Sequence, residues 1–202
     1  MSAGVAVSVA LAIGVSLGAL AVVVDEVDFR GARVILLFVS TGLSWGAAAI
    51  LVGAFSRQRA MACVAATVVL GSAIAAYYGL NQSLGLRDAP GAALLSEARL
   101  WGIAAVVGGP ILGFLGWTYR FGERRASSIA LGALCGLLLG QGLRLALRYG
   151  ISPDPVFTAA LLGPFVVLIA GLRGRSVLLA GGALCVTAIF AAAAWSVLES
   201  IG

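Results

Sequence analysis

The sequence predicts an all-α protein, a bundle of about seven transmembrane helices that forms a single integral membrane domain over residues 1–202. Hydrophobic residues make up 61% of the chain and charged residues only 10%, against about 25% charged residues in soluble domains. Apolar stretches of about 20 residues, the length that crosses a bilayer, recur along the chain. Lipid accepts the surface that such a composition produces. We therefore expect a multi-pass protein of the cell inner (cytoplasmic) membrane.

Seven segments qualify as spans, and the sixth is the shortest of them. The first lacks the basic start and the shorter apolar core of a secretory signal, so we expect it to be a retained helix. What remains between the spans is too little for a separate soluble domain. The seven segments are Ala3–Val24, Val34–Ser56, Ala60–Leu80, Leu100–Tyr119, Ala126–Leu143, Val156–Leu172 and Ser176–Leu198.

The longest connection runs from Asn81 to Arg99 and contains the turn signal Asp88-Ala89-Pro90-Gly91. After this turn, the residues Ala92–Arg99 are expected to form a short interfacial helix that leads into the fourth span.

The arginines predict the orientation of the bundle. The second, fourth and sixth loops hold seven Arg and one acid, whereas the first, third and fifth hold six Arg and six acids. The arginine clusters of the first group directly flank spans, which places those loops and the amino terminus in the cytoplasm. Because the arginines lie in short loops, with no basic face carrying interleaved aromatics, we expect no nucleic-acid partner.

The fourth and sixth spans share a pattern. Gly109-Pro110 and Gly163-Pro164 predict a break in each helix, and each span is followed by an arginine turn and an Ala-Leu-Cys sequence. A pseudo-repeat of two hairpins would explain this order. Chance in a chain rich in Gly, Ala and Leu is the alternative.

Glycines recur at four-residue spacing, which lets helix backbones approach closely in lipid. Tight packing inside the bundle and a face for a membrane protein partner both remain open. The spaced glycines are Gly14/Gly18, Gly42/Gly46, Gly109/Gly113 and Gly132/Gly136/Gly140.

The residue inventory argues against catalysis. Gly42-Leu43-Ser44-Trp45-Gly46 matches G-x-S-x-G, but the chain has neither the His base of that motif nor a Lys. The missing Lys excludes a retinal Schiff base, and the missing His removes haem and His-ligated metal sites. Cys63, Cys135 and Cys185 lie in separate apolar runs and are expected to pack as small hydrophobes. We expect no enzyme, no cofactor and no metal.

The candidate ligand-binding residues begin with Gln141 and Arg144, which share one helix face with Arg148. Nineteen residues separate Arg144 from Arg125, which puts Arg144 about 28 Å away, near the outer interface. There it could anchor the helix by snorkelling. Alternatively, Gln141 and Arg144 line an outward-facing cavity and hold an anionic or polar group.

Four aromatic residues complete the predicted ligand site. Trp45 is expected to lie deeper and form its floor. Tyr77, Tyr78 and Trp101 are expected to contribute to the site, with Glu97 or Arg99 as a further contributor. An aromatic-lined concavity with a few polar groups is the usual form of a ligand pocket.

The stretch Leu100–Gly116, with Ser44-Trp45, Tyr77-Tyr78 and Gln141-Gly142, resembles a family of uncharacterised actinobacterial membrane proteins of about this length. The resemblance implies a fold but no activity. An acidic residue often stands in that family at the position of Gln141, so this chain departs from the pattern there.

A looser resemblance is to the substrate-binding S components of energy-coupling-factor transporters. In these proteins a first helix with small residues docks a partner, a part that Ala10, Gly14 and Gly18 would play here.

Two functions follow as expectations. The first is a transport or ligand-binding membrane subunit with an outward-facing site, and the second is a non-catalytic structural or interaction membrane protein. The sequence leaves the ligand, the partners and the oligomeric state open.

Overall fold

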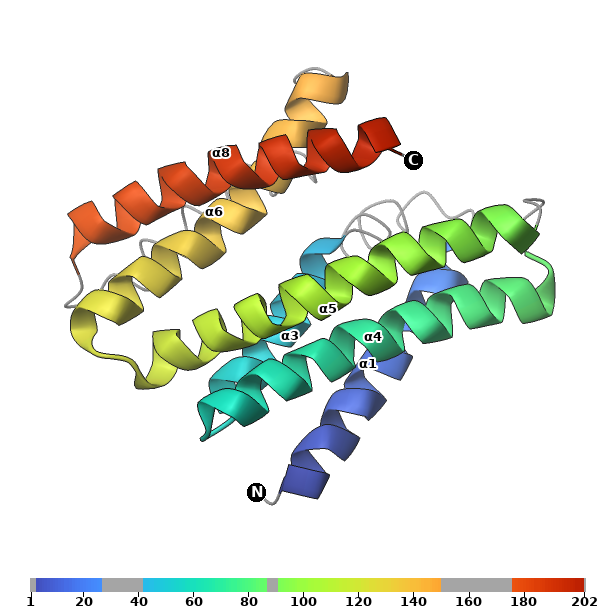
Figure 1. Cartoon of the computed structure of the whole chain (residues 1–202), viewed down its shortest axis with the longest axis horizontal. Helices are drawn as coiled ribbons and strands as arrows, with labels where there is room; N and C mark the ends of the chain where they lie inside the picture. The colour runs from blue at the N-terminus through green and yellow to red at the C-terminus, as the bar shows by residue number, and fades with distance from the viewer. Residues whose placement is uncertain (1–2, 27–41, 87–90, 150–175, 202) are drawn as a thin grey trace. The chain divides into compact units, whose positions relative to one another are not determined.

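The computed structural model describes residues 3–26, 42–86, 91–149 and 176–201 (Figure 1). All regular structure in these residues is helical, which confirms the all-α class. The helices are α1 (Ala3–Glu26), α3 (Gly42–Phe55), α4 (Arg59–Leu84), α5 (Gly91–Phe121), α6 (Arg124–Tyr149) and α8 (Val177–Ile201).

Three of the described helices are long and apolar enough to cross a membrane: α1, α4 and the Ala93–Phe121 part of α5. The 26 residues of α4 extend about 39 Å at about 1.5 Å per residue, more than the hydrocarbon thickness of a bilayer. Ser44–Phe55 and Val177–Ile189 are shorter apolar helices. The count of seven spans stays a prediction, because the sixth span, 156–172, and most of the first half of the second lie outside the described residues.

Helix α5 differs from its prediction in two ways. It begins at Gly91, so the residues expected to form a separate interfacial helix are its first turns. It also continues through Pro110 without the predicted break. Transmembrane helices tolerate proline where neighbouring helices support the backbone, and Gly109 lies directly against Thr67 of α4. The second predicted break, at Pro164, lies outside the described residues.

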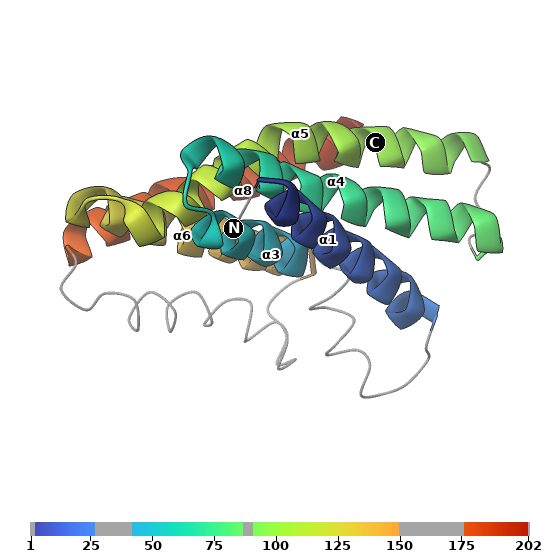
Figure 2. The same cartoon turned by 90° about the horizontal axis from the view of Figure 1, so that it is seen from below.

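The chain forms two compact units, residues 1–117 and 118–202. In the first unit α1 packs along α4, and α3 packs against α4 beside it (Figures 1 and 2). The interior of this unit is built from small side chains, which is how helices pack where lipid tails are as apolar as the core. The alanines without exposed surface in the first unit are Ala10, Ala21, Ala49, Ala62, Ala65, Ala66 and Ala73.

Glycines bring the helices of the first unit into backbone contact. A Cβ atom added to Gly14 would collide with Ser72 and the Val69 carbonyl of α4, and one added to Gly113 would collide with the Ala62 carbonyl. The predicted close packing is therefore present inside the chain. The docking face implied by the S-component resemblance lies against α4, since Ala10, Gly14 and Gly18 are buried there.

The second unit contains α6 packed along α8. Gly132 lies against the backbone of Ala180, and Gly136 lies against Leu184 and Thr187. The hydroxyl of Ser128 accepts a hydrogen bond of 3.1 Å from the Ser176 amide where α8 begins. The predicted pseudo-repeat is not tested, because the sixth span lies outside the described residues.

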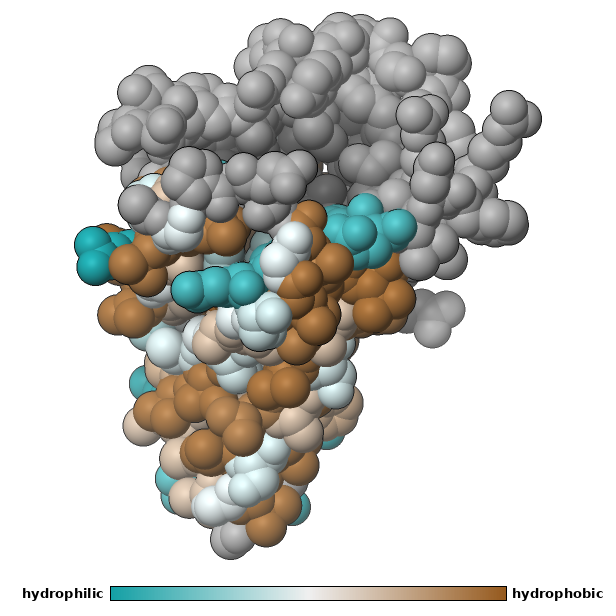
Figure 3. Space-filling model, turned by 90° about the vertical axis from the view of Figure 1, so that its right-hand side faces the viewer, coloured by the Kyte–Doolittle hydropathy of each residue, from teal (hydrophilic) through white to brown (hydrophobic). Residues whose placement is uncertain are grey.

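Large apolar side chains point outward from both units. Leu178 of α8 is 88% exposed and Val106 of α5 is 65% exposed. Figure 3 shows one face, where apolar side chains cover much of the described surface and hydrophilic ones form smaller patches. Small residues inside and large apolar residues outside are the arrangement expected of a protein whose solvent is lipid.

Candidate functional site

Four aromatic residues that the sequence predicted for the site come together at one end of the first unit. The rings of Trp45 and Tyr77 are 6.0 Å apart and inclined by 70°. Tyr77 and Tyr78 are 5.1 Å apart and nearly perpendicular. Trp101 packs with Trp45 and Tyr78 against the same buried cluster. Edge-to-face pairs of this kind are favourable, because the positive ring edge meets the negative ring face.

Two carboxylates border these rings. The Tyr77 hydroxyl donates a 2.6 Å hydrogen bond to Asp25 Oδ2, and the Tyr78 hydroxyl donates a 3.3 Å hydrogen bond to Glu97 Oε2. Asp25 lies in the last turn of α1 and Glu97 in the second turn of α5, so helices of alternating direction bring them to one end. We call the residues Asp25, Trp45, Tyr77, Tyr78, Glu97 and Trp101 the acidic aromatic end.

Tyr77 occupies the deepest position of this cluster. It is 8% exposed, whereas Trp45, which the sequence predicted to lie deeper, is half-buried. The amide of Asn81, 4% exposed, donates a 2.9 Å hydrogen bond to the Tyr77 carbonyl one turn earlier. The tyrosine is thus held both through its backbone and through its hydroxyl.

The structure does not test the predicted role of Gln141 and Arg144. Both lie in the α6 backbone, in the second unit, but their side chains are outside the described part of the chain. Asp25 was not among the predicted site residues. Its position directly after the first apolar run, at the predicted outer end of that span, was the signal that could have found it.

The opposite end of the first unit is basic. Trp117 of α5 donates a 3.1 Å hydrogen bond from Nε1 to the Arg57 carbonyl. The Arg59 guanidinium lies over the same ring, 4.5 Å from its centroid. Both arginines are exposed. We call Arg57, Arg59 and Trp117 the basic end.

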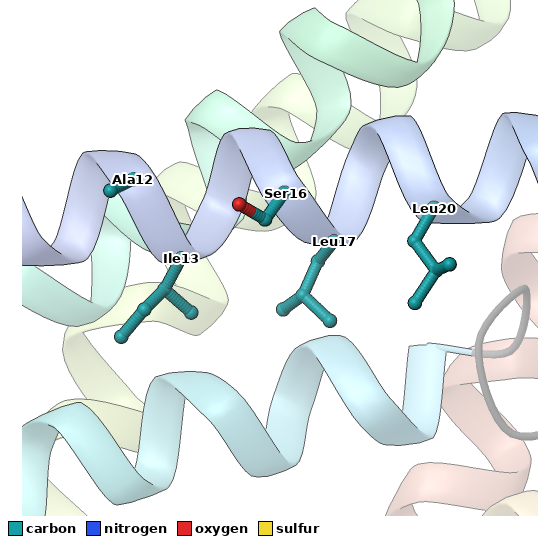
Figure 4. Close-up of a pocket in the computed structure, with 5 residues that line it drawn as sticks. All are labelled: Ala12, Ile13, Ser16, Leu17 and Leu20. Carbon is teal, nitrogen blue, oxygen red and sulfur yellow. The ribbon is translucent and has the colours of Figure 1, made fainter.

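A hollow of about 370 Å³ lies along α1 on the side that faces α3. Ile13, Leu17 and Leu20 point toward α3, and Ser16 contributes the one hydroxyl of the lining (Figure 4). A ligand site needs a few placed polar groups to orient its ligand, so this apolar hollow is the weaker candidate. Among the described residues, no three Asp, Glu or Cys side chains come together in a way that could hold a metal ion.

A model of the family of unknown function DUF6518 matches residues 1–201. No curated protein and no solved structure matches the chain.

Proposed function

Because the chain belongs to the family of unknown function DUF6518, we propose a function from the geometry of its first unit. The protein is a small multi-pass protein of the cell inner membrane that acts as a ligand-binding or transport subunit. Its ligand site is the acidic aromatic end, and that end faces outward. The convergence of four aromatic rings and two carboxylates from four helices is the observation that carries this proposal. It assigns no catalytic residue and no cofactor.

The charge asymmetry of the first unit supports the orientation. Asp25, Glu26 and Glu97 lie at one end, accompanied by Arg99, whereas the tight turn between α3 and α4 at the other end carries Arg57 and Arg59. Arginine-rich short loops remain on the cytoplasmic side. The loops that follow α1 and α4 in the sequence also contain Arg30, Arg33 and Arg87, so the compact Arg57-Gln58-Arg59 turn, and not the number of arginines, supports the proposed cytoplasmic amino terminus. The seven spans are part of the same proposal.

Cysteine labelling will test the orientation. The native cysteines lie inside helices, at positions 63, 135 and 185, so they are first replaced by Ala. In this background, Ser83→Cys near the end of α4 should react with a membrane-impermeant maleimide in intact cells. Gln58→Cys, at the start of α4, should react only after the membrane is opened. The reverse pattern would overturn the orientation.

The chemistry of the acidic aromatic end favours a ligand with a positively charged amine. Aromatic faces attract cations, and Trp and Tyr do so most strongly. Asp25 and Glu97 add negative charge beside three half-buried rings and one buried ring. An organic cation of the choline type fits both features. An anionic ligand at this site would be repelled by the carboxylates of Asp25 and Glu97, which would lower its affinity.

Fluorescence titration of the purified protein in neutral detergent tests this ligand class. Choline and tetramethylammonium are the probes, and Trp45 and Trp101 report binding. We expect a saturable change in fluorescence. Glu97→Gln should weaken the affinity for the amine at least about tenfold, which corresponds to about 1.4 kcal/mol. Glu26→Gln is the matched control, because Glu26 is an exposed carboxylate next to Asp25. No saturable change, or equal weakening by both variants, would contradict the proposal.

The same titration tests the anion site predicted from the sequence. Small carboxylates such as acetate replace the amines, and Arg144→Ala replaces Glu97→Gln. A saturable response to the carboxylates that is lost in Arg144→Ala would support the Gln141 and Arg144 site and reject the cation site.

The second candidate function is a structural or interaction membrane protein. The two phenol–carboxylate hydrogen bonds favour it, since they tie three helices together without any ligand. Small exposed residues on α4, Gly71, Ala75 and Gly79, also leave room for a neighbouring helix. A protein that binds neither probe but loses stability when the Tyr77 contacts are removed would fit this function.

A further inference from the structure

The basic end presents two exposed arginines beside one tryptophan, which contacts the backbone of Arg57 and the guanidinium of Arg59. Arg57 lies in the three-residue turn between α3 and α4, and Arg59 is the first residue of α4. The Trp117 indole Nε1 donates a 3.1 Å hydrogen bond to the Arg57 carbonyl in this turn. The Arg59 guanidinium lies over the Trp117 ring, 4.5 Å from its centroid. A cation on an aromatic face keeps its N–H edge available for further hydrogen bonds.

The surroundings leave this positive charge uncompensated in the described part of the first unit. The first turn of α4 contains no acidic residue, and its N-cap residue Gln58 makes no side-chain capping bond. The first amides of α4 therefore add a partial positive charge beside the two guanidinium groups. Ser56 cannot contribute its hydroxyl hydrogen, because that hydrogen is donated to the Val52 carbonyl at 2.9 Å.

The depth of the basic end, at the ends of α3 and α5, indicates which kind of anion its arginines would bind. Trp117 is half-buried, and the exposed apolar residues Phe55 and Phe114 lie on the same helix ends. Amphipathic rings and arginines at the end of a span lie at the depth of lipid headgroups. Arginine clusters at that depth recognise anionic phosphate headgroups.

We propose that Arg57 and Arg59, held by Trp117, bind the phosphate of an anionic phospholipid such as phosphatidylglycerol. The two guanidinium groups bind the phosphate oxygens, and the acyl chains lie along the exposed apolar faces of α3 and α5. This site lies at the opposite end of the first unit from the proposed ligand site and does not depend on it.

Native mass spectrometry of the purified full chain tests the proposal, with phosphatidylglycerol and phosphatidylcholine as the added lipids. We expect phosphatidylglycerol to bind in preference to phosphatidylcholine. Each arginine near a lipid surface contributes about a fivefold factor in affinity. The double variant Arg57→Gln/Arg59→Gln should therefore lower phosphatidylglycerol binding about 25-fold. Trp117→Phe keeps the ring but removes the hydrogen bond, so it should lower binding by a smaller factor.

Arg99→Gln is the control, because it removes an exposed arginine from the other end of the first unit. It should leave phosphatidylglycerol binding unchanged. Equal binding of the two lipids, or equal loss in Arg99→Gln and the double variant, would overturn the proposal. Competition by millimolar inorganic phosphate would also overturn it, since the site would then take free phosphate. Thermal unfolding of every variant confirms that each one is folded, and the single variants Arg57→Gln and Arg59→Gln replace the double one if it is not.

Discussion

Replacing Gly113 by valine is expected to lower the stability of the protein more than any other single change in α5. A Cβ at this position would meet the Ala62 carbonyl group, with its carbon at 2.7 Å, and the Ala66 Cβ at 2.9 Å. The backbone of Gly113 also lies within 2.8 Å of a Cβ added to Gly53. Three helices therefore meet at one glycine, and the obstructing atoms belong largely to backbone that cannot rotate away.

The expected loss is about 3 kcal/mol, the upper part of the range for overpacking a well-packed interior. For a chain of this length it corresponds to a fall of about 6 to 12 °C in the unfolding temperature. Thermal unfolding in detergent measures it. Gly108→Val is the matched control, since a Cβ on Gly108 of the same helix meets no atom within 4 Å. Equal effects of the two variants would show that α5 does not contact α3 and α4 as described.

The glycine spacing predicted that backbones would approach closely, but it did not identify the helices that meet. Gly14 and Gly18 contact α4, and Gly132 and Gly136 contact α8. Small residues at four-residue spacing mark a face of a helix, and any helix with a matching face can occupy it. Gly46 shows the limit of the pattern, because its nearest neighbour would be a leucine methyl at 3.9 Å. Spacing alone does not separate a tight contact from an open one.

The all-α class could be predicted from the sequence, because the thickness of a bilayer sets the length of the apolar segments that cross it. The behaviour of Pro110 could not, because its effect depends on the helices around it and not on the local sequence. The acidic aromatic end was predicted in part for a similar reason. Aromatic rings at span ends are a local signal, and Tyr77, Tyr78 and Trp101 carry it. The bond between Tyr77 and Asp25 joins residues 52 positions apart, and the sequence contains no local mark of that pairing.

Removing the Tyr77 side chain should cause the second large loss of stability. Tyr77 is buried and packs edge-to-face against Trp45 and Tyr78. Tyr77→Ala deletes both ring contacts and the hydrogen bond to Asp25. Truncating a buried aromatic residue to alanine typically lowers the free energy of unfolding by about 3 kcal/mol or more. Tyr77→Phe keeps the ring and removes only the hydroxyl. Its expected cost is about 1 kcal/mol, because the Asp25 carboxylate is exposed and can bind water instead.

A double-mutant cycle separates the hydrogen bond from the packing. Tyr77→Phe and Asp25→Asn should each lower the unfolding temperature, and the double variant should cost about 1 kcal/mol less than their sum. Tyr78→Phe provides the comparison, since its 3.3 Å bond to Glu97 is exposed and should be worth little. Additive effects in the first pair would mean that Tyr77 and Asp25 do not interact. Because Tyr77→Phe retains the aromatic face, a ligand site should still bind choline in this variant. If Tyr77 instead serves only to hold the helices together, Tyr77→Phe should lower the unfolding temperature and show no choline binding. Measuring both properties of this variant therefore tests both functions.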